Sequence, residues 1–71
     1  MPNLTERENY LEVAQRAAGL AAMFRDHAAE RTCAPHQRCY AETMADHYEA
    51  IAHVNLEMAK TIARKTLSAC H

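Results

Sequence analysis

The sequence predicts an all-α fold, an antiparallel hairpin of two long helices, on three observations. Alanine, the strongest helix former, occurs fifteen times in 71 residues. The only prolines are Pro2 and Pro35, so two long segments are free of helix-breaking residues. Apolar residues in both segments recur at alternating spacings of three and four. A chain of this length forms at most one small domain, so residues 1–71 are expected to be a single helical-hairpin domain.

The first helix is predicted to extend from about residue 6 to residue 31. It is expected to begin at Thr5-Glu6-Arg7-Glu8, which has the form of a capping box at a helix amino terminus. Gly19 is its weak point, because a glycine inside a helix costs about 1 kcal/mol relative to alanine. Gly19 therefore marks either a break between two shorter helices or a place where another backbone comes close.

A short hinge at residues 32–34 is predicted to precede the second helix, which is expected at about residues 35–68. Pro35 suits the first turn of a helix, where its missing N–H is no loss. It also disfavours helical geometry at Ala34. So short a connection makes the two helices antiparallel neighbours.

The apolar pattern predicts how the two helices pack. In the first helix a heptad seam is mostly alanine, so a partner helix can approach closely. Its members are Tyr10, Ala14, Ala17, Ala21, Phe24 and Ala28. The corresponding seam of the second helix is Met44, Tyr48, Ile51, Asn55, Met58 and Ile62. Asn55 either sets the register of the pair or lies at a partly hydrated edge.

Further apolar stripes lie beside these seams. They comprise Val13, Leu20 and Met23 in the first helix, and Ala52, Leu56, Ala59, Ala63, Leu67 and Cys70 in the second. A two-helix hairpin covers one face of each helix, so we expect these stripes to drive association into a bundle or coiled coil, as a homo-oligomer or with another protein. The alternative is that the small residues among them simply face solvent.

Several classes of function are excluded. The net charge is −1 with acidic and basic residues interspersed, which disfavours nucleic acid as a partner. The longest apolar run, residues 17–24, is far shorter than the ~20 residues of a membrane span. An odd number of cysteines and an amino-terminal stretch without an apolar core indicate a reduced, cytoplasmic protein.

The hinge sequence CAPHQRC raises the question of a metal site. Cys33, His36 and Cys39, with His27 as a fourth ligand, offer the nitrogen and sulfur atoms that zinc prefers. The competing interpretation is a turn in which cysteine is a small buried apolar residue, and no cofactor is then expected. Catalysis by Cys39 and His36 lacks oxyanion donors and a third residue that orients the histidine, so we do not expect an enzyme.

One family resemblance bears on the partner. Met1, Leu4, Thr5, Glu8 and Leu11 precede an alanine-rich helix, a proline-containing hinge and a second helix with the sequence YEAIAHV. This arrangement resembles the small cytoplasmic E component of type III secretion needle assembly. The resemblance implies a hairpin co-chaperone that acts with a helical-repeat chaperone to hold the needle subunit in the cytoplasm and prevent its early polymerisation.

The sequence therefore predicts a protein-binding module, a co-chaperone or adaptor that covers a self-assembling helical partner. The predicted partner-binding residues are Tyr48, Ile51, Met58, Ile62, Leu56 and Leu67, of which the first three are expected to matter most. Two alternatives stay open at this point. One is a phage-type small inhibitor that clamps a host protein, and the other is a zinc-binding helical hairpin.

Overall fold

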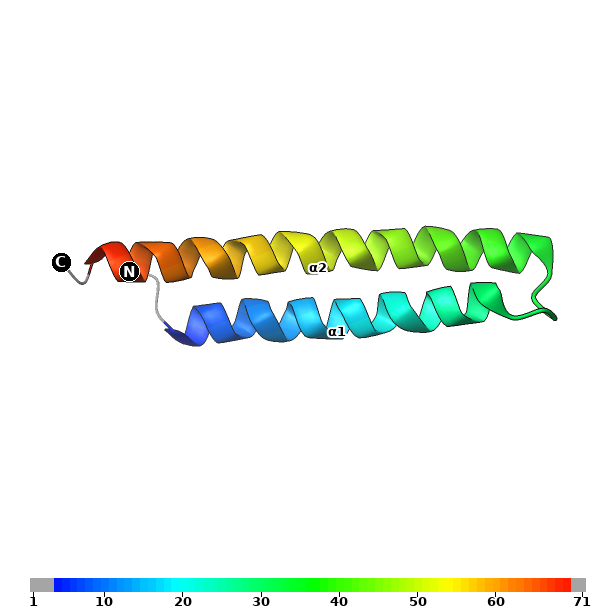
Figure 1. Cartoon of the computed structure of the whole chain (residues 1–71), viewed down its shortest axis with the longest axis horizontal. Coiled ribbons are helices and arrows are strands. Elements are labelled where there is room, and N and C mark those ends of the chain that lie inside the picture. The colour runs from blue at the N-terminus through cyan, green and yellow to red at the C-terminus, as the bar shows by residue number, and fades with distance from the viewer. Residues whose placement is uncertain (1–3, 70–71) are drawn as a thin grey trace.

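The computed structural model describes residues 4–69 as two helices and a hinge. Helix α1 is Leu4–Ala29 and helix α2 is Pro35–Ala69. Side-chain environments are described for residues 5–65, so the predictions for Leu67 and Cys70 lie outside them. The helices run antiparallel, with the start of α1 and the end of α2 at the same end of a rod measuring 57 × 13 × 13 Å (Figure 1). The predicted all-α helical hairpin is confirmed.

Helix α1 is continuous through Gly19. A Cβ atom added to Gly19 would meet no heavy atom within 4 Å, so no other backbone approaches it. Both interpretations of this glycine, a break and a close approach, are wrong for the hairpin. Strong helix formers surround Gly19 in the sequence, and their summed preference outweighs the cost of one glycine.

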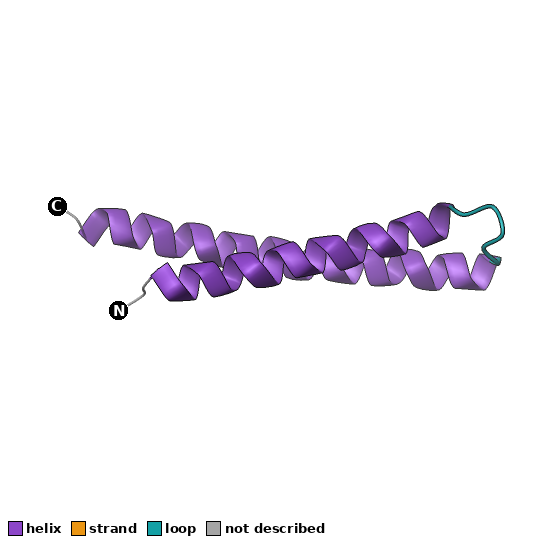
Figure 2. Ribbon diagram, turned by 90° about the horizontal axis from the view of Figure 1, so that it is seen from below, coloured by secondary structure: helices purple, strands orange, loops and turns teal. Residues whose placement is uncertain are grey.

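The two helices pack through alanine. The side chains involved, which we call the alanine seam, are Ala14, Ala17, Ala21 and Ala28 of α1 with Ala41, Ala45 and Ala59 of α2, and all are buried. Small side chains allow the helix axes to lie at the short end of the usual packing distance. Figure 2 shows the helices crossing at a shallow angle, which keeps them in contact along most of their length.

In α1 the four alanines of the predicted seam are buried, whereas Phe24 is only partly covered. In α2 the predicted seam is right at Ile62, which is 5% exposed, but it is wrong at Met58 and omits three buried alanines. Met58 was expected between the helices and is 42% exposed, whereas Ala59, assigned to the outer stripe, is 1% exposed. Ala41 and Ala45, which were not part of the predicted seam, are fully buried. Small residues fit the narrow gap beside the alanines of α1, so the larger side chains of α2 other than Ile62 lie toward its margins.

The hinge comprises residues 30–34 and is two residues longer than predicted. The N–H of Glu30 donates to the His27 carbonyl at 3.2 Å, and that of Cys33 donates to the Glu30 carbonyl at 3.1 Å. The first bond tightens the last turn of α1, which ends at Ala29, and the second closes a turn within the hinge. Helix α2 begins at Pro35, as expected.

Arg38 ties the hinge to the end of α1. Its Nε donates to the Ala28 carbonyl at 3.0 Å and its Nη2 to the Cys33 carbonyl at 3.5 Å. The last carbonyls of a helix lack partners within the helix, and positive charge is favourable at this end. One side chain from the first turns of α2 therefore caps α1.

Replacing Gly19 with alanine should stabilise the protein by about 1 kcal/mol, because the new methyl group meets open space and alanine is the better helix former. Thermal or urea unfolding measures the change. The exposed neighbour Ala18 provides the reverse control, since Ala18→Gly should lower the free energy of unfolding by a similar amount. Loss of stability in Gly19→Ala would contradict this account of α1.

Ala21→Leu should destabilise the hairpin by about 1–3 kcal/mol, since Ala21 is 2% exposed and a longer side chain must push the helices apart. The adjacent variant Ala22→Leu adds the same atoms at an exposed position and should leave the urea midpoint nearly unchanged. Equal midpoints for the two variants would mean that the alanine seam is not closely packed.

Candidate protein-binding face

Nearly all the large apolar side chains at the margins of the alanine seam lie on one side of the hairpin. We call this side the apolar face. Its members are Val13, Leu20, Met23 and Phe24 of α1 and Tyr40, Met44, Tyr48, Ile51 and Met58 of α2. At 100° per residue they fall along one edge of each helix relative to the seam, so the two edges form a single surface.

An aromatic cluster joins the two halves of this face. Phe24 of α1 stacks on Tyr48 of α2 with ring centroids 5.8 Å apart and an interplanar angle of 9°. It also meets the ring of Tyr40 edge-on, at 6.3 Å and 77°. Aromatic pairs in these geometries contribute about 0.5–1.5 kcal/mol beyond their area burial. The cluster fixes which edge of α1 lies beside which edge of α2.

The apolar face is open to solvent. Met23 is 67% exposed and Tyr40 is 62% exposed, although both are large and apolar in body. Two shallow hollows lie along this side. One is lined by Leu20, Met23, Phe24 and His27 of α1, and the other by His47, Ala50, Ile51, Val54 and Asn55 of α2. A contiguous apolar surface of this kind is typical of a protein-binding site.

The opposite side carries an ion pair between the helices. The Arg25 guanidinium donates from Nε and Nη2 to the two carboxylate oxygens of Glu49, at 2.6 and 2.7 Å. Its Nη2 also donates to Asp46 at 2.9 Å. A two-point contact between a planar guanidinium and a carboxylate is geometrically specific. Together with the aromatic cluster, it sets the roll and the register of the two helices.

The same contact shifts the pKa values of Glu49 and Arg25. Hydrogen bonds from Arg25 lower the pKa of Glu49 below its ordinary value, because they stabilise the carboxylate. The bonds to Glu49 and Asp46 likewise raise the pKa of Arg25. All three side chains remain substantially exposed, so salt screens the interaction.

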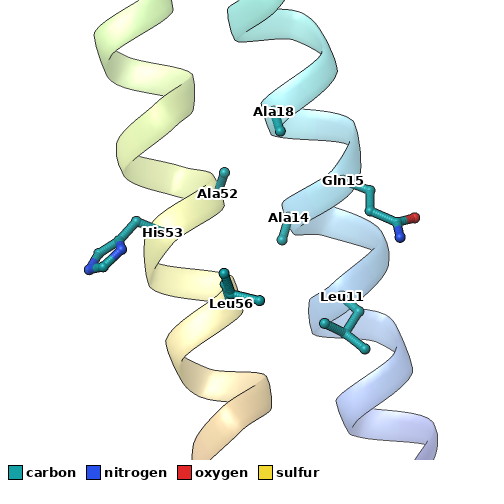
Figure 3. A pocket seen from close by; sticks show the side chains of 7 residues that line it. All are labelled: Leu11, Ala14, Gln15, Ala18, Ala52, His53 and Leu56. Carbon is teal, nitrogen blue, oxygen red and sulfur yellow. The ribbon is translucent and has the colours of Figure 1, made fainter.

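A third apolar hollow, similar in size to the other two, lies on this second side. It is lined by Leu11, Ala14, Gln15, Ala18, Ala52, His53 and Leu56. Figure 3 shows Leu11 and Leu56 on either side of the gap between the helices, while Gln15 and His53 point away from it. Leu11 and Leu56 are the two large apolar side chains that line this hollow, whereas the apolar face has nine members.

The predicted partner-binding residues are divided among different surroundings. Tyr48, Ile51 and Met58 lie on the apolar face. Leu56 lines the hollow on the opposite side, so it is not a member of the apolar face. Ile62 is 5% exposed within the hairpin. The side chain of Leu67 falls outside the described residues.

Sequence reasoning did not assign Tyr40 or Phe24 to this surface. The apolar pattern predicts Phe24 in the seam between the helices and does not include Tyr40. The sequence does contain a signal for the α2 part of this surface. Met44, Ile51 and Met58 recur at heptad spacing beside a stripe of alanines, and this pattern indicates an apolar stripe along the margin of the seam.

The residues considered as zinc ligands are not brought together. Cys33 is buried in the hinge, with its thiol 3.7 Å from the Ala34 carbonyl, while Cys39 is exposed. Nδ1 of His27 lies 3.7 Å from a carboxylate oxygen of Glu30. Within residues 4–69, no three His, Cys, Asp or Glu side chains are grouped so that they could hold a metal ion.

Fold and surface together define an antiparallel helical hairpin with one apolar face. Comparisons with known protein families, curated proteins and solved structures find no match for this chain. Neither helix, over its described length, contains a stretch apolar enough to cross a bilayer.

The Arg25–Glu49 contact makes stability depend on pH in one direction. Since folding lowers the pKa of Glu49, its contribution is present above the ordinary carboxylate pKa and is lost as the pH falls through the folded-state value. The melting temperatures of the wild type and Glu49→Gln should therefore converge between about pH 6 and about pH 3.

Glu12→Gln is the matched control for this experiment, because Glu12 pairs with Arg16 on the same helix and links no second helix. At the higher pH, the melting temperature of Glu12→Gln should differ from that of the wild type by less than that of Glu49→Gln does, as expected for a pair within one helix. An offset of Glu49→Gln that did not change with pH would contradict the role given to this carboxylate.

Proposed function

We propose that this hairpin is a protein-binding module that covers an apolar helical surface of another protein. The observation that carries the proposal is the apolar face, where Met23, Tyr40 and Met58 are exposed together on one side of a thin rod. Apolar side chains in such number are costly in water and become favourable when a partner covers them.

A helical partner fits this face best. The face is long and nearly straight, and its side chains project from two parallel edges with the shallow hollows beside them. An amphipathic helix can lie along such a surface and insert side chains spaced at i, i+3, i+4 and i+7. Tyr48 and Ile51 lie near the middle of the face, where binding energy is usually concentrated.

The proposal extends to the activity of a co-chaperone. Covering the apolar stripe of a self-assembling helical subunit would stop that subunit from joining its own copies. The resemblance to the E component of type III secretion names the partner class: a needle subunit, bound together with a helical-repeat chaperone in the cytoplasm. The free thiols of Cys33 and Cys39 are consistent with a reducing compartment.

Truncation of the central anchors tests this function. Ile51→Ala and Met58→Ala should each weaken binding to a purified type III needle subunit, with its helical-repeat chaperone present, by more than about 1 kcal/mol. Titration calorimetry measures the affinity, and light scattering measures whether the subunit still polymerises.

Leu56→Ala is the control for these variants, because it removes a similar side chain from the opposite side of the hairpin. It should bind as the wild type does. Full-strength binding by both Ile51→Ala and Met58→Ala would exclude the apolar face as the docking surface, and a subunit that polymerises unhindered beside the wild-type chain would exclude the co-chaperone activity.

A further inference from the structure

We infer that, in the absence of another partner, a second copy of this chain occupies the apolar face and closes the two hairpins into an antiparallel four-helix bundle. The inference rests on the proposed use of the apolar face for protein binding. It names a second copy of the chain as the protein bound to this face. The exposed area, the register of the helices and the charge of the face favour that choice.

The exposed area matches what a dimer would cover. The hairpin exposes 5393 Å² for a mass of 8.0 kDa. A compact monomer of that mass exposes about 4,450 Å², so the hairpin carries an excess of about 900 Å². A standard protein interface removes about 800 Å² from each partner. One further hairpin on the apolar face would therefore bring the exposed area per chain to that of a compact protein.

The missing core gives a second reason. The most deeply buried apolar side chains of the hairpin are alanines, and Phe24, Tyr48 and Ile51 are only partly covered. Four-helix bundles bury a wide apolar stripe on each helix, whereas this hairpin buries a narrow one. A second hairpin would supply the other half of a bundle core around these larger side chains.

The register of the helices places large apolar side chains of both at the same levels of the face. Phe24 lies beside Tyr48 and Arg25 pairs with Asp46, and residue numbers run in opposite directions along antiparallel helices. Leu20 of α1 is therefore level with Ile51 of α2, and Val13 is level with Met58. If a two-fold axis passes through the middle of the face, Leu20 and Ile51 of one copy lie opposite Leu20 and Ile51 of the other. This holds whether the two hinges lie at the same end of the bundle or at opposite ends.

Charge does not oppose this contact. None of the nine residues of the apolar face is charged, so two copies can meet without placing like charges opposite one another. The interhelix ion pair of Arg25 lies on the other side of the hairpin. Arg16, near the margin of the face, is paired with Glu12 at 2.6 Å. The face is thus apolar in its middle and neutral at this margin, as a symmetric contact requires.

Sedimentation equilibrium of the full chain under reducing conditions tests the inference. The wild type should have twice the 8.0 kDa mass of one chain at micromolar concentrations, and its melting temperature should rise with concentration. Leu20→Glu places two carboxylates near the symmetry axis and should raise the dimer dissociation constant more than about 100-fold.

Leu56→Glu is a closely matched control. Leu20 and Leu56 are the same residue type and each is 39% exposed, but they lie on opposite sides of the hairpin. Leu56→Glu should remain dimeric. If Leu20→Glu does not fold, the milder pair Leu20→Ala and Leu56→Ala gives the same comparison, with alanine favourable to the helix in both.

A wild type that stays monomeric, with a melting temperature independent of concentration, would overturn the inference. So would equal weakening of the dimer by substitutions at Leu20 and Leu56. The outcome is separate from that of the proposed function: a monomer that binds the needle subunit refutes only the second copy, and a dimer that ignores the subunit refutes only the co-chaperone activity.

Discussion

Close packing of alanine against alanine is the constraint on which the rest of this structure depends. The seam alanines of α1 and of α2 are all buried between the helices, so the gap is too narrow for most of the larger side chains. The methionines, aromatic residues and isoleucine at neighbouring positions must therefore lie at the margins. Burying a methyl group yields much less free energy than burying a leucine or phenylalanine side chain. The hairpin thus gains little from its own core and presents the more valuable apolar area to solvent.

Two contacts between the helices keep the large apolar side chains on one side of the hairpin. The stacking of Phe24 on Tyr48 and the ion pair of Arg25 with Glu49 lie on opposite sides of the alanine seam. A small rotation of either helix about its axis would break both contacts. They therefore hold the roll of the helices, and the large apolar side chains of both gather on the side of the aromatic rings.

The sequence was sufficient to predict the two helices, but it was not sufficient to predict which face of α2 packs against α1. Alanine content and Pro35 predicted two helices and the start of the second, and the seam of α1 followed from its heptad spacing. On α2, periodicity alone could not choose between the Met44–Ile51 stripe and the adjacent alanine stripe, because both have heptad spacing. The width of the gap decided the choice, and that width depends on the other helix. The pairing of Glu49 with Arg25 was missed for the same reason, since it joins residues 24 positions apart.

The placement of the chain ends has a mechanical consequence. The start of α1 and the end of α2 lie together, with the hinge at the far end (Figure 1). A force that pulls these two ends apart loads one level of alanine contacts at a time, so the hairpin should unzip at low force rather than shear. The levels beside the capped hinge open last and, because they close the shortest loops, they re-form first when the force is released.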